Sequence, residues 1–139
     1  MKVSKILSKS DTGESGSNQS GVLVPKDKAI LKFFPTLVEE KKNPRQTIVF
    51  SGPENDKWSF NFIHYNNLKY GGTRNEYRLT CIRGFLKKYN LHHRDILLLQ
   101  YDQQNGYTIN YEVDRNAGTG KKIILKNTWK VINIGLQVQ

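Results

Sequence analysis

The most informative part of the chain is a polar loop with the sequence Gly71-Gly72-Thr73-Arg74-Asn75-Glu76-Tyr77-Arg78. Its two glycines allow a flexible turn, and three of its side chains can each hydrogen-bond to a base edge. Arg suits the O6 and N7 atoms of guanine, Asn suits adenine, and Glu accepts from the amino group of cytosine. We therefore predict that Arg74, Asn75 and Glu76 contact the bases of a DNA duplex.

Positive charge surrounds this loop. Between residues 66 and 94, seven Lys or Arg side chains accompany a single acid, Glu76. A solvated face on a basic protein would also fit the composition. Three features favour contacts with DNA instead: the charge is almost all of one sign, it lies in a loop, and the loop uses Arg. We predict phosphate or supporting contacts from Lys69, Thr73, Tyr77, Arg78, Lys87, Lys88, His92 and Arg94.

A second polar segment, residues 8–20, has no large apolar side chain and connects strands expected at residues 3–7 and 22–24. Long loops in compact domains are often functional, although a plain surface linker fits the composition equally well. If residues 8–20 are a functional loop, they form a first arm that extends from the strands. Residues 66–77 then form a second arm. The first arm would contact bases through Ser17, Asn18 and Gln19, and phosphates through Lys9 and Ser15.

The rest of the chain predicts a mainly β protein with two short helices. Apolar runs and alternating patterns predict further strands over residues 47–50, 58–65, 96–101, 107–113, 123–125 and 129–134. Pro25 is expected to open one helix, and Thr80 to cap a second helix that stops near Asn90. About seven or eight strands indicate a barrel or a sandwich. We expect one domain, residues 1–139.

Composition narrows the function classes. The net charge of +10 favours a polyanionic partner. Nucleic acid is favoured over a membrane, because no apolar run approaches the ~20 residues of a spanning helix. Cys81 is the single cysteine, so there is no disulfide framework, and we expect it to be buried. A reducing, cytoplasmic compartment of bacterial type fits this composition.

No motif supports catalysis or a cofactor. Asp27 and Glu39 loosely resemble the acids of a metal-dependent nuclease, but they are expected on a helix and a loop instead of adjacent strands. His92 and His93 are adjacent and cannot easily bind one ion. His64 shares a strand face with aromatic residues, so we expect a hydrogen-bonded core or rim histidine. We expect no enzyme activity, no metal and no cofactor.

The order of these parts resembles the DNA-binding pseudobarrel of plant B-three domains and of the N-terminal, effector-binding domain of EcoRII-type restriction endonucleases. Residues 8–16 and 21–25 resemble the first arm and its following strand, and residues 70–80 resemble the second arm. Residues 91–99 resemble the family's step from a helix to a strand. Arg94 stands there before Asp95, where the plant domains usually have Gly. The resemblance covers most of the chain.

The resemblance implies a seven-stranded open pseudobarrel with two flanking short helices, which grips double-stranded DNA in the major groove with its two arms. It also implies a short GC-rich site such as CCWGG, and a recognition or effector module of a restriction endonuclease, either linked to a nuclease domain or encoded alone. We expect a monomer. The alternatives are a single-stranded nucleic-acid or RNA-binding barrel, which needs exposed aromatics for stacking, and a stand-alone transcription-type DNA-binding protein.

Overall fold

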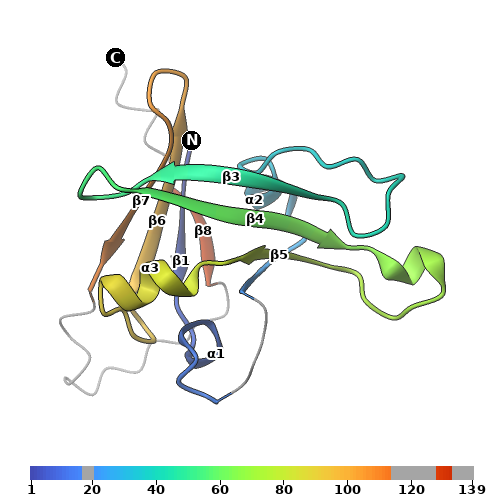
Figure 1. Cartoon of the computed structure of the whole chain (residues 1–139), viewed down its shortest axis with the longest axis horizontal. Coiled ribbons are helices and arrows are strands. Elements are labelled where there is room, and N and C mark those ends of the chain that lie inside the picture. The colour runs from blue at the N-terminus through green and yellow to red at the C-terminus, as the bar shows by residue number, and fades with distance from the viewer. Residues whose placement is uncertain (17–20, 114–127, 133–139) are drawn as a thin grey trace.

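The computed structural model describes residues 1–16, 21–113 and 128–132 and shows a strongly curved sheet with short helices around it (Figure 1). Within these ranges, eight strands follow the spatial order β2-β5-β4-β3-β7-β6-β1-β8. They are Lys2–Ile6 (β1), Val22–Val24 (β2), Arg45–Ser51 (β3), Lys57–Tyr65 (β4), Glu76–Thr80 (β5), Ile96–Asp102 (β6), Gly106–Glu112 (β7) and Trp129–Ile132 (β8). The mainly β prediction is confirmed. The eight strands agree with the seven or eight expected from the sequence pattern, and are one more than the resemblance implied.

The sheet curls into a nearly closed barrel. β3 meets β7 in one parallel bridge between Ser51 and Thr108, whereas the other neighbouring strands pair antiparallel. The two edge strands are β2 and β8. Between them, the Trp129 indole N–H donates to the Leu23 carbonyl at 2.8 Å. A side chain therefore bridges the open seam of the barrel.

Aromatic side chains fill much of the barrel interior. Phe50, Phe60 and Phe85 are fully buried, and Phe34 stacks on Phe62 with ring centroids 4.5 Å apart. Burying one such side chain contributes about 1.5–3 kcal/mol relative to leaving it exposed. This interior holds the strands, and the loops that leave them, at fixed separations.

Two helix boundaries differ from the prediction. The helices in the described ranges are α1 (Lys9–Thr12), α2 (Lys28–Leu31), the 3-10 helix η1 (Asn67–Tyr70) and α3 (Arg83–Lys88). α2 does not open at Pro25: it follows an Asp27 N-cap, whose carboxylate accepts from the Ala29 amide at 2.9 Å. Thr80 does not cap α3, because it ends β5 and pairs with Asn61 in the sheet. Sheet pairing outweighs the local capping preference there.

Left-handed backbone marks the turns on both sides of α3. Asn90 has φ 53° and ends the helix as predicted, with the Leu91 amide donating to the Leu86 carbonyl at 2.9 Å. Arg94 has φ 79°, a conformation that glycine adopts easily, so the turn before β6 keeps a glycine-like backbone. Cys81 has φ 69° and is exposed. The prediction that it is buried is wrong, because it lies in the turn between β5 and α3.

Candidate nucleic-acid interface

The two polar arms join the same short strip of sheet, formed by β2 and β5 (Figure 1). The strands pair through Val22–Leu79, Leu23–Arg78 and Val24–Tyr77. The first arm therefore reaches the strip at its Leu79 end, and the second arm reaches it at its Tyr77 end. At ~3.4 Å per residue, these two points lie about 7 Å apart along β5.

The first arm begins with a short helix that its own side chains stabilise. In α1 the Ser8 hydroxyl accepts from the Asp11 amide at 3.1 Å, and the Asp11 carboxylate accepts from the Ser8 amide at 2.9 Å. This is a capping box. Asp11 also forms an ion pair with Lys5 of β1 at 3.0 Å, and both side chains are buried. The helix departs from the predicted loop; the Ser-x-x-Asp spacing is the sequence signal for it.

The segment after α1 is attached to the turn before β6. Glu14 accepts from the His93 backbone amide at 2.7 Å and lies 2.9 Å from the His93 ring. A hydrogen bond from Thr12, opposed by burial and reinforced by His93, lowers the pKa of Glu14 to about 2. The first arm is thus held at two places. The predicted base contacts of this arm lie outside the described residues: Ser17, Asn18 and Gln19.

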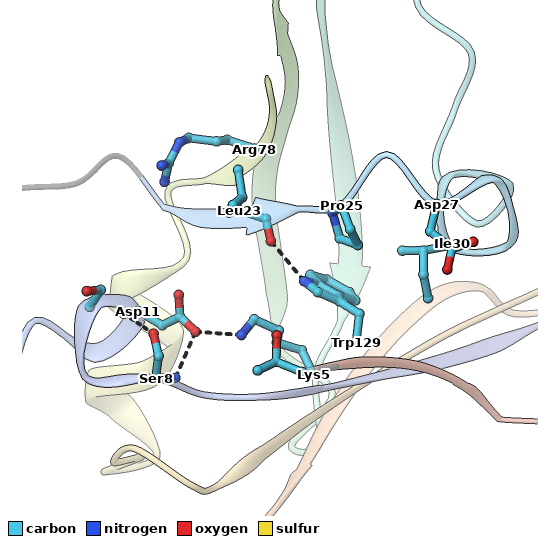
Figure 2. Close-up of a pocket in the computed structure, with 11 residues that line it drawn as sticks. Lys5, Ser8, Asp11, Leu23, Pro25, Asp27, Ile30, Arg78 and Trp129 are labelled. Atoms are coloured by element: carbon cyan, nitrogen blue, oxygen red, sulfur yellow. Dashed lines mark hydrogen bonds and ion pairs between the residues drawn. The ribbon is translucent and has the colours of Figure 1, made fainter. Parts of the chain in front are cut away.

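A pocket of about 540 Å³ lies between α1 and the strip (Figure 2). Leu23 and Arg78, which are partners in the β2–β5 ladder, both line it. Leu23 is half exposed, whereas Arg78 is largely buried. The Arg78 guanidinium pairs with Glu76 and donates to the Gly21 carbonyl at 3.4 Å. Arg78 therefore connects the beginning of β5 to the end of the first arm.

The second arm folds around the side chain of Asn67. The Asn67 amide oxygen accepts from the Arg74 backbone amide at 2.7 Å, and the Leu68 amide donates to the Arg74 carbonyl at 2.9 Å. Gly71 supplies a left-handed turn with φ 88°. The Arg74 guanidinium stacks 3.8 Å from the centre of the Tyr65 ring, a cation–π contact. The arm thus has a defined shape and leaves the Arg74 side chain 42% exposed.

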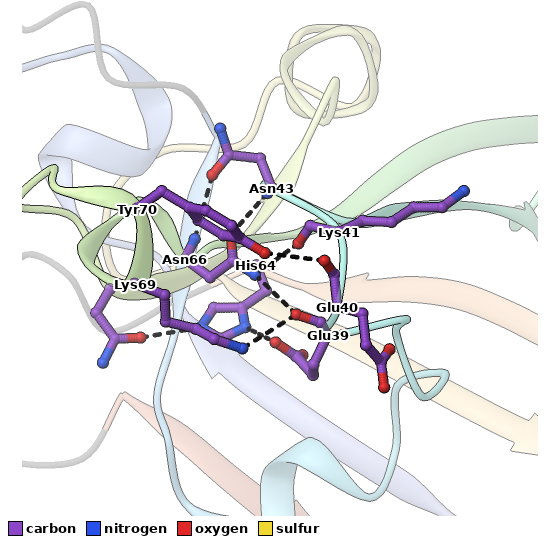
Figure 3. Close-up of polar contacts among 9 residues, drawn as sticks. Glu39, Glu40, Lys41, Asn43, His64, Asn66, Lys69 and Tyr70 are labelled. Atoms are coloured by element: carbon purple, nitrogen blue, oxygen red, sulfur yellow. Dashed lines mark hydrogen bonds and ion pairs between the residues drawn. The ribbon is translucent and has the colours of Figure 1, made fainter.

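The loop between α2 and β3 supports the second arm from behind (Figure 3). The buried Asn66 side chain donates to a carbonyl of this loop at 2.9 Å and accepts from the Asn43 amide at 2.7 Å. Lys69 and Tyr70 donate to the backbone carbonyls of residues 39 and 40, at 3.1 and 2.9 Å. The sequence analysis does not identify these supports, because the partners lie 23 to 30 positions apart and no local pattern links them.

His64 connects the same loop to the tip of the second arm. Its Nδ1 lies 2.7 Å from the Glu39 carboxylate, and its Nε2 lies 2.9 Å from the Asn75 amide oxygen. The ring is buried and stacks on Tyr77, with centroids 4.1 Å apart. The prediction of a hydrogen-bonded core or rim histidine is confirmed.

The three residues of the second arm that are predicted to contact bases lie together at one end of the strip. Glu76 begins β5 and lies between two guanidinium groups, pairing with Arg78 and, at 3.5 Å, with Arg74. Burial favours the neutral acid, but hydrogen bonds from Arg78 and Arg74 outweigh it and lower the pKa of Glu76. Asn75 is exposed beside them. That these side chains contact DNA remains a prediction.

The predicted phosphate contacts fall into three places. Four of them are exposed on the arms: Lys9, Ser15, Lys69 and Thr73. Three more line hollows that border the first arm: Lys87, His92 and Arg94. Lys88 lies apart at the β3–β4 turn, where its ammonium pairs with Asp56 at 2.8 Å. The hydrogen bond to Asp56 raises the pKa of Lys88, so a phosphate contact there has to compete with this pair.

The two acids of the loosely nuclease-like pattern serve separate structural purposes, since Asp27 caps α2 and Glu39 contacts His64. Among residues 1–16, 21–113 and 128–132, no group of three or more His, Cys, Asp or Glu side chains could hold a metal ion. No helix in these ranges is long and apolar enough to cross a membrane.

Comparison with known proteins shows the family. The sequence profile described as "Restriction endonuclease EcoRII, N-terminal" matches residues 1–105, which include both arms. The chain belongs to this family. The resemblance drawn from the two arm motifs is therefore confirmed for this EcoRII-type domain. No similar sequence was found among curated proteins.

Two solved structures share the fold of the EcoRII-type domain. An Arabidopsis FUS3–DNA complex is 23% identical with a TM-score of 0.60, and the match covers 78% of this chain and 93% of that one. The B3 domain of UbaLAI restriction endonuclease, with cognate DNA, is 21% identical with a TM-score of 0.53, and the match covers 79% and 65%. The pseudobarrel prediction is confirmed by these neighbours.

Proposed function

We propose that this EcoRII-type domain binds double-stranded DNA sequence-specifically in the major groove, with one arm on each side of the groove. The observation that carries the proposal is that both arms are held by buried or paired side chains at the two ends of one short strip. The net charge of +10 supports a polyanionic partner. The two neighbours of the same fold are DNA complexes, which supports the same class of partner.

The second arm supplies most of the base recognition in this proposal. Arg74 donates to guanine, Asn75 contacts adenine or a neighbouring base, and Glu76 accepts from a cytosine amino group. Glu76 can keep its Arg78 pair while doing so, because a carboxylate offers about four acceptor positions. The first arm adds base contacts from Ser17, Asn18 and Gln19. The remaining proposed contacts are to phosphates, from Lys9, Ser15, Lys69, Thr73, Lys87, Lys88, His92 and Arg94, with Tyr77 and Arg78 as supports.

Residues 1–139 act in this proposal as one monomeric recognition or effector module of a restriction endonuclease, without a catalytic site of its own. Pairing between β8 and β1 supports a single unit, because it places residues 129–132 in the same sheet as the N-terminus. The family points to a short GC-rich duplex, with CCWGG as the first candidate site.

Selection of binding sites from a random duplex pool tests the proposal. Arg74→Ala is expected to lose about 1–3 kcal/mol on the selected site and to relax the preference at one base pair. Arg74→Lys keeps the charge but loses the planar fork, so it should relax the same position with a smaller loss of overall affinity. An unchanged preference in Arg74→Ala would show that the arm has been wrongly assigned.

Two further measurements address the alternatives. A gel-shift competition between the duplex and its separated strands should favour the duplex, and a preference for single strands would indicate an oligonucleotide-binding barrel. Incubation of plasmid with magnesium and the domain should leave the plasmid intact, and clean cleavage would overturn the assignment as a module without catalysis.

A further inference from the structure

The contact between His64 and Asn75 determines which group the tip of the second arm can offer to a base. A primary amide has one face that accepts, at Oδ1, and one that donates, at Nδ2. His64 Nε2 lies 2.9 Å from one of these groups, so a DNA base meets mainly the other. Asn75 is exposed on the arm, whereas His64 is buried beneath it.

Hydrogen-bond accounting limits His64 to two states. The Glu39 carboxylate 2.7 Å from Nδ1 is an acceptor, so Nδ1 carries a hydrogen in both states. In the imidazolium, Nε2 also carries a hydrogen and can donate to Asn75 Oδ1, the amide atom that lies 2.9 Å away. In the neutral ring, Nε2 can only accept, and the Asn75 amide must turn over so that Nδ2 donates to it. The charge of His64 and the orientation of Asn75 are therefore coupled.

We propose that His64 is a specificity-determining positioning residue whose protonation reverses the hydrogen-bonding group that Asn75 presents to DNA. The charged ring leaves the Nδ2 donor facing outward, which suits the acceptor atoms of guanine or thymine in the major groove. The neutral ring leaves the Oδ1 acceptor facing outward, which suits the amino groups of adenine or cytosine. The inference rests on the proposed function, because it takes Asn75 to contact a base.

The groups around His64 are suited to such a change. Glu39, from the loop after α2, faces Nδ1 and stabilises the charged ring. Lys69 of η1 donates to the Glu39 backbone carbonyl at 3.1 Å, and the Arg74 guanidinium lies over the neighbouring Tyr65 ring. Tyr77 of β5 stacks on the ring; burial and then the Glu39 charge raise the pKa of Tyr77, so its phenol stays neutral.

The test begins by locating the base pair that Asn75 contacts. Binding of the selected duplex and of variants at each position is compared for the unmodified domain and Asn75→Ala, and the position that Asn75→Ala no longer distinguishes is identified. Relative affinities at this position are then measured from about pH 5.5 to 8. Guanine or thymine should be favoured at low pH and adenine or cytosine at high pH, with the ratio changing by about fivefold or more. Preferences at the other positions serve as internal controls, because titration of other groups changes all sequences alike.

Three variants separate this role from a merely structural one. His64→Phe keeps a ring to stack on Tyr77 but removes both hydrogen bonds, so the preference at the Asn75 position should become weak and independent of pH. Glu39→Gln keeps a polar partner but removes the charge that stabilises the imidazolium, so the reversal should move to lower pH. Asn75→Asp presents only acceptors, and should favour adenine or cytosine throughout. Thermal unfolding is measured for each, to confirm that it folds.

The outcomes distinguish the inference from the proposed function. If the domain shows no sequence preference at any pH, the proposed function fails. A second outcome is a sequence preference that Asn75→Ala alters but that neither pH nor His64→Phe changes. This outcome overturns the positioning role of His64 and leaves the proposed function standing. A reversal with pH that persists in Asn75→Asp would also overturn it.

Discussion

Arg94 occupies a position where backbone geometry and charge favour different residues. Its φ of 79° costs an L-residue roughly 1–2 kcal/mol, whereas glycine adopts this conformation freely. The Arg94 amide donates to the Leu7 carbonyl at 2.7 Å, so the strained turn is also the place where the chain leaves β1 for the first arm. The predicted phosphate contact of Arg94 is one that glycine could not make.

A comparison of two substitutions isolates the strain at Arg94. Arg94→Gly and Arg94→Ala both remove the side chain and its interactions, but only glycine relieves the backbone. The free energy of unfolding of Arg94→Gly is expected to exceed that of Arg94→Ala by about 1 kcal/mol, as measured by urea denaturation. Both variants should lose the same DNA affinity, since both lose the cation. Equal stability of the two would show that the turn is not strained.

At the scale of single elements, the first arm is attached by the buried Lys5–Asp11 pair. Lys5→Met is expected to lower the free energy of unfolding by about 3 kcal/mol, because it leaves the Asp11 carboxylate buried without its cation. The double variant Lys5→Met, Asp11→Leu should recover much of that stability, because two apolar side chains replace the pair.

The same double variant provides the control for arm position. Its Asp11→Leu change also removes half of the capping box in α1. DNA binding by the double variant should therefore be weaker than that of the unmodified domain, even though the free energy of unfolding recovers. Urea denaturation and gel shifts on the selected duplex measure the two effects separately. Recovery of both stability and DNA binding would mean that the pair does not position the first arm.

Glu14 makes the attachment of the first arm depend on pH. Its pKa is lowered from 4.5 to about 2 in the folded chain, so its contribution to stability is present in full above about pH 4.5. The contribution is lost as the pH falls toward 2. Thermal unfolding between pH 6 and 2 should therefore show a steeper loss for the unmodified domain than for Glu14→Gln, and the two should converge near pH 2. Parallel curves would exclude this role for Glu14.

At the scale of the whole molecule, net charge determines how binding responds to salt. Lys9 is exposed on the first arm, and each phosphate contact contributes about one unit to the slope of log affinity against log salt. Lys9→Ala should therefore weaken binding to all sequences alike and reduce the slope by about one. Lys57→Ala removes an exposed lysine at the start of β4, the end opposite the second arm, and should change neither. Equal effects of the two would indicate a diffuse charge effect instead of a localised interface.

Local sequence determined much of this protein. Alternation of apolar residues determined the strands, and Gly and short polar side chains determined the two arms. The types of Arg74, Asn75 and Glu76 determined which base edges the second arm can match, because donor and acceptor groups belong to the side chain itself. The Thr80 prediction failed because pairing across the sheet outweighs the local capping preference. The Pro25 prediction failed because Asp27, two positions later, caps the helix instead.

Only the tertiary structure decided which groups support those arms. Arg78 reaches Gly21 across 57 positions, and His64 reaches Glu39 across 25. Strand order and register create these contacts, and neither quantity is encoded in the periodicity of a single segment. The arms are polar because of their sequence, but they join opposite ends of one strip because β2 and β5 pair in one particular register.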